Sequence, residues 1–103
     1  MELKDIRERI NEIDSQMVAL FCSRMDASAA VAKAKAESGL GVRDKKRERE
    51  VLARVAGLAG SEYETYAKVL FTTLMSLSRS YQHALSAGDS LSPRLRAAME
   101  STP

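Results

Sequence analysis

One stretch decides the fold of this chain: residues 2–38, which read ELKDIRERINEIDSQMVALFCSRMDASAAVAKAKAES and contain neither proline nor glycine. Apolar or small side chains recur there in alternating steps of three and four, at Leu3, Ile6, Ile10, Ile13, Met17, Leu20, Ala27, Val31 and Ala34. This spacing predicts one uninterrupted helix that packs against other helices along a single face. The step after Leu20 falls on Arg24, so a cation interrupts the apolar row.

The length of this helix implies a partner. At about 1.5 Å per residue the helix would be roughly 55 Å long, whereas a compact domain of about 100 residues has a radius of gyration of about 13 Å. The rest of the chain is too small to cover such a helix along its whole length. We therefore expect a homodimer in which a second copy packs about a two-fold axis.

The composition excludes several classes of protein. The length of 103 residues suits one domain, and 45% hydrophobic with 29% charged residues indicates a globular chain. A net charge of +2 is too small to favour nucleic acid or an anionic membrane as the partner. No run approaches the roughly 18 apolar residues of a membrane span, and the charged N-terminus does not read as a signal peptide. The single Cys22 cannot form a disulfide within the chain, so we expect a cytoplasmic protein.

Two further helices follow, which makes the expected fold all-α. The strict alternation of strands is missing throughout. Asp44 is placed to cap a second helix over about residues 45–56. Ser61 and Glu64 form a capping box that would open a third helix reaching about Leu85. The expected apolar stripe of that helix consists of Tyr63, Ala67, Leu70, Leu74, Leu77, Tyr81 and Leu85.

Glycines mark the expected breaks between helices. Gly39 and Gly41 follow the first helix, and Gly57 and Gly60 bracket the turn after the second. Residues 1–85 would then form the helical domain. Residues 86–103 contain Gly, Ser and Pro, and we expect them to be a mobile or weakly helical C-terminal tail.

Two cations share one face of the first helix. Lys35 follows Arg24 by eleven residues, and eleven steps of about 100° return to within about 20° of the same direction, about 16 Å further along the axis. Arg7 precedes Arg24 by seventeen residues, which places it about 25 Å away and about 100° around the helix. One small ligand could bind both Arg24 and Arg7 only if Arg7 came from the other chain of an antiparallel dimer.

The other two helices also carry polar groups beside their apolar faces. Asp44, Arg47 and Glu48 cluster at the start of the second helix, where Glu48 heads the apolar face and should point inward. Ser78 and Gln82 are an i, i+4 pair on one face of the third helix. Burying these groups without partners would be costly, so we expect them to bond to each other or to a ligand.

These polar residues have two interpretations. In the first, Arg24 and Lys35 pair with Glu48 in an interior salt-bridge network. In the second, inward-facing cations outnumber the one carboxylate, and a small dicarboxylate ligand neutralises the excess with bidentate hydrogen bonds. The sequence offers no Cys/His cluster for a metal, no glycine loop for phosphates and no nucleophile–base pair. An enzyme built this way would need neither a cofactor nor a covalent intermediate.

Five short segments form an ordered pattern along the chain. They are IRERINEID at residues 6–14, Arg24–Met25, VAKAK at residues 31–35, VRDKKRE at residues 42–48, and Ser78 with Gln82. No one segment is decisive, but the complete ordered set resembles the all-helical chorismate mutase family over about residues 3–85. The resemblance favours the small-anion pocket over the salt-bridge network.

The resemblance implies a fold and a reaction. Members of this family are homodimers of three-helix chains, intertwined through their long first helices, with two equivalent sites. They convert chorismate to prephenate by an intramolecular [3,3] rearrangement, in the biosynthesis of phenylalanine and tyrosine, without a cofactor. By this resemblance the chain would be an isomerase with the type II fold.

The resemblance also implies a role for each matching residue. Arg24 resembles the arginine that binds one substrate carboxylate, and Arg7 resembles the one that the partner chain donates to the other carboxylate. Lys35 matches the lysine that bonds a carboxylate and the ether oxygen. Gln82 matches the second donor to that ether oxygen.

The remaining matches concern the other end of the substrate. Glu48 matches the acceptor for the ring hydroxyl, assisted by main chain near Asp44. Arg47 and Ser78 match supporting positions, with Ser78 at the carboxylate end of the pocket. The catalytic set would be Lys35, Gln82, Arg24 and Glu48, and the substrate-binding set would add Arg7, Asp44, Arg47 and Ser78.

Two other functions fit helices of this kind. Related helical proteins are isochorismate-pyruvate lyases with similar cations, but segment 44–48 resembles the mutases more closely. A non-catalytic helical dimer, serving regulation or assembly, would be free to lose the ether-oxygen donors, yet Lys35 and Gln82 are both present. Comparing the turnover of chorismate with that of isochorismate would distinguish a lyase from a mutase. Activity of the isolated chain would exclude the non-catalytic dimer.

Overall fold

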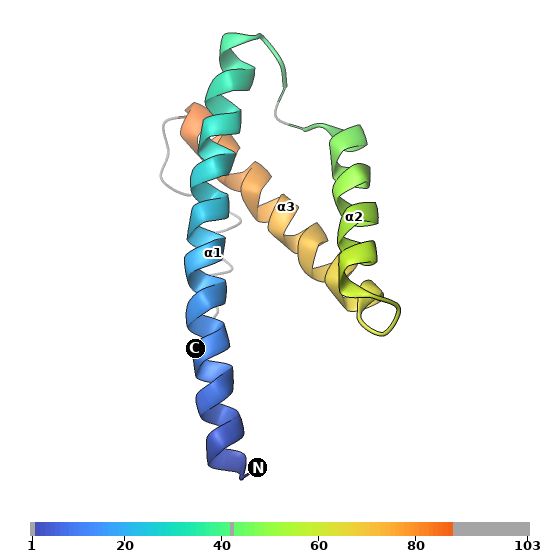
Figure 1. Cartoon of the computed structure of the whole chain (residues 1–103). Coiled ribbons are helices and arrows are strands. Elements are labelled where there is room, and N and C mark those ends of the chain that lie inside the picture. Colours follow the sequence, from blue (N-terminus) through green and yellow to red (C-terminus); the bar gives the residue numbers. More distant parts are fainter. Residues whose placement is uncertain (1, 42, 88–103) are drawn as a thin grey trace.

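The computed structural model describes residues 2–41 and 43–87, which form three helices (Figure 1). The helices are α1 (Leu3–Glu37), α2 (Lys45–Ala59) and α3 (Glu64–Ala87). This part of the chain contains no strand, so the predicted all-α fold with a long first helix is confirmed. Within the same ranges, no helix combines the length and the apolar character that crossing a membrane requires.

The first helix, α1, is unbroken over 35 residues and ends within one residue of each predicted boundary. It stops at Gly39, whose φ of 72° is a conformation that other residues rarely adopt. The N–H of Leu40 donates to the carbonyl of Lys35 at 2.8 Å, and the N–H of Gly39 donates to that of Ala36 at 3.2 Å. This pair of bonds is a Schellman motif, which satisfies carbonyls that the end of a helix leaves unpaired.

The start of α2 agrees with the prediction, whereas its end does not. The carboxylate of Asp44 accepts a hydrogen bond from the backbone N–H of Arg47 at 3.0 Å, which is the expected N-cap. The helix then continues through Gly57 to Ala59, three residues beyond the predicted end. A glycine inside a helix costs about 1 kcal/mol relative to alanine, which does not stop this one. Gly60, with a φ of 82°, ends α2 instead.

The third helix, α3, begins later than the sequence predicts. It starts at Glu64, so Ser61 lies in the preceding turn and the predicted capping box does not open the helix. The N–H of Ala67 bonds the carbonyl of Tyr63 at 2.9 Å, which makes Tyr63 the N-cap residue. The helix ends at Ala87, two residues beyond the predicted end. Residues 88–103, the main part of the predicted tail, lie outside the described residues.

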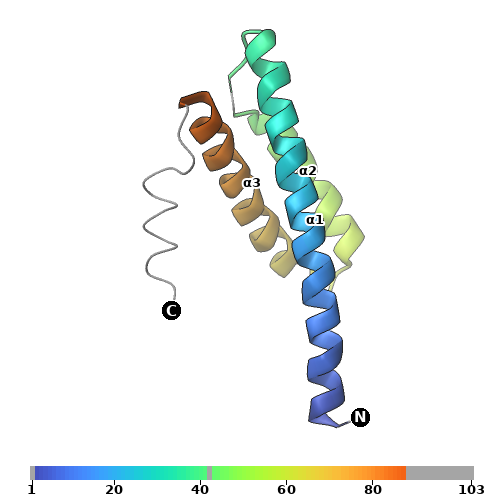
Figure 2. The same cartoon turned by 90° about the vertical axis from the view of Figure 1, so that its left-hand side faces the viewer.

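Contacts made by α3 hold the three helices together. It packs extensively against both α1 and α2, and it runs from the C-terminal end of α2 to the C-terminal half of α1 (Figures 1 and 2). The buried residues of α3 are Met75, Ser78, Gln82 and Ala84. Of the predicted apolar stripe, Ala67, Leu74, Leu77 and Tyr81 are half-buried, whereas Tyr63, Leu70 and Leu85 are exposed. The buried row through Met75, Ser78 and Gln82 lies one position later in the sequence than the stripe.

The N-terminal half of α1 extends past the other two helices in both views (Figures 1 and 2). Its apolar row from Leu3 to Met17 is exposed, with exposed fractions between 41% at Ile6 and 60% at Leu3. The chain measures 54 × 33 × 21 Å, and its radius of gyration of 16.3 Å exceeds the roughly 13 Å of a compact domain of this size. As the sequence predicts, α2 and α3 do not cover this helix along its whole length.

Alanine substitution should have opposite effects at Gly57 and Gly60. A Cβ at either position would meet no atom within 4 Å, so backbone conformation alone decides the outcome. Gly57→Ala should raise the free energy of unfolding by about 1 kcal/mol, because alanine favours a helix interior. Gly60→Ala should lower it by about 1–3 kcal/mol, because its φ of 82° and ψ of 167° suit glycine almost alone. Urea unfolding measures both values, and a destabilised Gly57→Ala variant would contradict the position of Gly57 inside α2.

Candidate active site

A small polar cavity of about 180 Å³ lies where the three helices meet. Its lining comprises Arg24, Ser28, Val31 and Lys35 from α1, Asp44, Arg47, Glu48 and Val51 from the start of α2, and Met75, Ser78, Arg79 and Gln82 from α3. The cavity thus gathers seven of the eight residues that the sequence predicts for the site. The shared face predicted for Arg24 and Lys35 is confirmed, since both line this one cavity.

The side chain of Arg24 is held in place by α3. Its Nη1 donates to Oγ of Ser78 at 2.8 Å, and its guanidinium lies 5.8 Å from the ring centre of Phe71. Ser78 is 8% exposed, and its Oγ also accepts a hydrogen bond from Ser28 at 3.1 Å. An arginine fixed by a buried hydroxyl and an aromatic face presents its remaining N–H groups in a defined direction.

The side-chain amide of Gln82 is also fixed. The residue is 6% exposed, and its Nε2 donates to the backbone carbonyl of Ser28 at 2.9 Å. This bond orients the amide so that its nitrogen lies on the α1 side, against the helix that carries Arg24 and Lys35. Since Nε2 carries two hydrogens, one donor remains for another acceptor.

The carboxylate of Glu48 faces the interior, as the sequence predicts, with 19% of its side chain exposed. Its Oε2 accepts a hydrogen bond from Nη1 of Arg79 at 2.5 Å, and its Oε1 lies 3.5 Å from Nη2 of Arg43. The salt-bridge interpretation paired Glu48 with both Arg24 and Lys35, whereas Arg24 donates its hydrogen bond to Ser78. The Glu48 carboxylate thus pairs with two arginines that are not among the predicted site residues.

Asp44 and Arg47 lie at the edge of the cavity. The Asp44 carboxylate caps α2, and the Arg47 guanidinium lies 3.9 Å from Glu50 with 64% of its side chain exposed. Both residues are therefore accessible from solvent, in contrast to the buried Ser78 and Gln82.

Sequence reasoning missed two polar residues of the site, Ser28 and Arg79. Ser28 follows Arg24 by four residues and precedes Lys35 by seven, so helix geometry alone would have placed it on the same face. Arg79 is adjacent to Ser78, but its partner Glu48 is 31 residues away in the sequence. No spacing rule connects these two residues, so only the packing of α2 on α3 reveals the pair.

Arg7 is not brought to the cavity within one chain. It is exposed on the N-terminal part of α1 that extends past the other helices. The seventeen residues that separate it from Arg24 correspond to about 25 Å of helix. A single chain therefore forms the site without this predicted residue.

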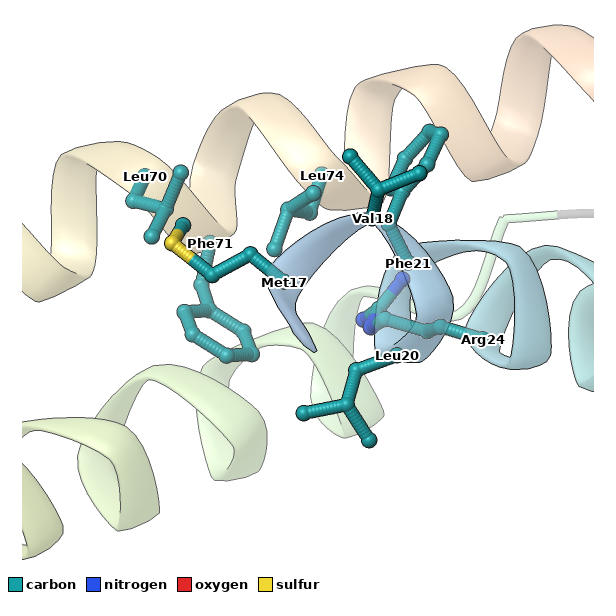
Figure 3. A pocket seen from close by; sticks show the side chains of 8 residues that line it. All are labelled: Met17, Val18, Leu20, Phe21, Arg24, Leu70, Phe71 and Leu74. Atoms are coloured by element: carbon teal, nitrogen blue, oxygen red, sulfur yellow. The ribbon is translucent and has the colours of Figure 1, made fainter. Parts of the chain in front are cut away.

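Two larger, mainly apolar cavities adjoin Arg24. One, of about 440 Å³, lies between α1 and α3, where the side chains of Met17, Val18, Leu20, Phe21, Leu70, Phe71 and Leu74 surround it with Arg24 (Figure 3). The other, of about 500 Å³, lies between α2 and α3 and includes Arg24, Arg47 and Arg54 among apolar residues. Among the residues that line the first cavity, Arg24 alone is polar. The polar side chains are therefore gathered around the small cavity rather than around this larger one.

The electrostatic balance of the polar cavity is positive. Four cationic side chains and two carboxylates line it, which leaves an excess of two positive charges. Among the described residues, no group of three or more His, Cys, Asp and Glu side chains is placed to hold a metal ion. The arrangement suits a small anion held by guanidinium, ammonium and amide donors.

Comparison with known families agrees with this geometry. A sequence model of the chorismate mutase type II family matches residues 6–83. Comparison with curated proteins and with solved structures gave no significant match. Because the family match extends from the start of α1 through the Ser78–Gln82 segment of α3, this chain belongs to the chorismate mutase type II family and is an enzyme, an isomerase.

Proposed function

We propose that this chain converts chorismate to prephenate by an intramolecular [3,3] rearrangement, in the biosynthesis of phenylalanine and tyrosine, and that the polar cavity is its active site. The observation that carries the proposal is that Arg24 and Lys35 of α1, Glu48 of α2 and Gln82 of α3 line one small cavity. The catalytic unit in this proposal is the helical domain, residues 1–85. The single cysteine of the chain accords with a cytoplasmic location.

The charge of the cavity supports this substrate. Chorismate carries two carboxylates, and the cavity has an excess of two positive charges. Arginine binds a carboxylate through two parallel hydrogen bonds, which fixes orientation as well as position. Arg24, held by Ser78 and Phe71, is the clamp for one carboxylate in the proposed complex.

The reaction requires positioning rather than proton transfer. One C–O bond breaks and one C–C bond forms within the same molecule, so neither a nucleophile nor a cofactor takes part. The flexible enolpyruvyl group must lie over the ring, and holding it there removes much of the entropic part of the barrier. Two clamps, each binding one of the two carboxylates of the substrate, would hold the enolpyruvyl group in this position.

The ether oxygen gains negative charge as its bond to the ring breaks. Donors already directed at that oxygen stabilise the transition state more than the bound substrate. Lys35 supplies one donor in this proposal, and Gln82 supplies the other through the Nε2 hydrogen that its bond to Ser28 leaves over. Glu48 accepts the hydrogen bond of the ring hydroxyl at the opposite end, while Asp44 and Arg47 complete the edge of the site.

The second carboxylate clamp comes from a partner in this proposal. We propose a homodimer in which the uncovered part of α1 packs against a second copy and donates its Arg7 to the site around Arg24. The exposed apolar row of α1 and the open cavities beside Arg24 support this arrangement. A site shared between chains would explain why Arg7 lies apart from the other predicted residues.

The purified chain should convert chorismate to prephenate at an enzymatic rate. The loss of chorismate absorbance measures the rate, and chromatography identifies the product. Isochorismate serves as the parallel substrate: release of pyruvate from it, with no prephenate from chorismate, would replace the mutase with a lyase. A folded dimer that turns over neither compound would indicate a binding module.

Lys35→Ala should lower kcat by about 100- to 1,000-fold, the usual effect of removing one donor from a developing oxyanion. Lys33→Ala is the matched control, because Lys33 is an exposed lysine on the same turn of α1 and does not line the cavity. Circular dichroism would check that both variants keep their helices. A Lys35→Ala variant as active as Lys33→Ala would show that Lys35 is not the ether-oxygen donor.

Mixing two inactive variants should restore activity if the site is shared. Arg7→Ala and Arg24→Ala should each be nearly inactive, since each removes one carboxylate clamp from both sites. A hybrid dimer has one site with both arginines and one with neither, so an equal mixture should recover about a quarter of wild-type activity after random exchange. Exchange is verified independently with tagged chains. No recovery despite verified exchange would refute the shared site.

A further inference from the structure

The ion pair between Arg79 and Glu48 has no part in the mechanism described so far. The two side chains are largely buried, with exposed fractions of 24% and 19%, and their charged atoms lie 2.5 Å apart. The pair connects the first turn of α2 with the C-terminal half of α3. Such a short bond between sheltered charges holds its partners more firmly than an exposed ion pair does.

The two oxygens of the Glu48 carboxylate have different surroundings. Oε2 is bonded to Arg79, whereas Oε1 lies 3.5 Å from Arg43, whose side chain is 54% exposed. A contact of that length to an exposed arginine is screened by water and easily exchanged. One oxygen is therefore anchored by a short bond, and the other has only a long contact with an exposed arginine.

The same pair lies between two cavities. Glu48, Met75 and Arg79 line both the polar cavity and a neighbouring cavity of about 260 Å³ between α2 and α3. The neighbouring cavity also contains the cations of Arg43 and Arg49. Without Arg79, no side chain of α3 would hold Oε2, and the Glu48 carboxylate would be free to turn between the cations of the two cavities.

We propose that Arg79 is a positioning residue, which anchors Oε2 of Glu48 so that Oε1 faces the ring hydroxyl of chorismate. The assignment rests on the proposed function, in which Glu48 accepts the hydrogen bond of that hydroxyl. Arg79 acts through Glu48 and touches neither the breaking nor the forming bond. Because substrate and transition state both keep the hydroxyl, losing this contact should raise KM more than it lowers kcat.

The test is a double-mutant cycle on chorismate turnover with Arg79→Met, Glu48→Gln and the double variant. In the wild-type background Arg79→Met should raise KM by about 10-fold or more and change kcat by less than about 3-fold. In the Glu48→Gln background the same substitution should change KM by less than about 2-fold, because the charged carboxylate through which Arg79 acts is gone. Arg79→Lys should recover part of the lost affinity.

Arg43→Met is the matched control, since it removes the other arginine beside the same carboxylate. It should change KM by less than about 2-fold, as expected for an exposed pair. An Arg43→Met variant as impaired as Arg79→Met would overturn the proposal, because the effect would then follow from charge alone. Equal losses from Arg79→Met in both backgrounds would overturn it too, because the effect would not pass through Glu48.

Thermal melting followed by circular dichroism checks that each variant folds. If Arg79→Met does not fold, Arg79→Gln takes its place in both backgrounds and is held to the same expectations. A wild-type chain without chorismate turnover would overturn the proposed function and this assignment with it. An active wild type with an additive cycle would overturn the role of Arg79 alone.

Discussion

Buried hydrogen bonds between α1 and α3 are the constraint on which the rest of the structure depends. Ser78 and Gln82 bond Arg24 and Ser28 across the contact between these helices. Leaving any one of these buried groups unpaired would cost about 1–3 kcal/mol, so sliding one helix along the other is penalised more sharply than apolar contacts alone would penalise it. Every buried side-chain nitrogen and oxygen of the described residues has a partner. The bonds that set the register of α1 on α3 are therefore the same bonds that orient the donors of the site.

The sequence predicted those parts of the structure that local geometry determines. The boundaries of α1 follow from an uninterrupted apolar repeat and from Gly39, and the start of α2 follows from the capping side chain of Asp44. The shared face of Arg24 and Lys35 follows from the helix period. Seven predicted site residues meet in one cavity, because those on α1 and α3 lie on the buried faces of their helices and the others lie at the start of α2.

The errors arose where a pattern has more than one physical cause. An apolar stripe on α3 shows which face avoids water, but it does not distinguish contacts within the chain from contacts with a partner. The face buried within the chain carries Ser78 and Gln82, and the predicted stripe beside it stays partly exposed. The glycine pattern predicts a helix end near Gly57, but a glycine destabilises a helix only modestly. The backbone conformation of Gly60 ends the helix instead. The bond between Arg79 and Glu48 joins residues far apart in the sequence, where no periodicity applies.

The exposed apolar row on α1 has a consequence for how the protein behaves at different concentrations. Burying apolar surface stabilises a protein by roughly 25 cal/mol per Å². A single chain lacks this stabilisation wherever the apolar row is exposed to water. In the proposed dimer association supplies it, so stability depends on protomer concentration through mass action. Because Arg7 reaches the site only from a partner in that arrangement, the same equilibrium sets the number of complete sites. At low abundance, doubling the amount of protein would then more than double the flux through the reaction, which links catalytic output to the expression level of the chain.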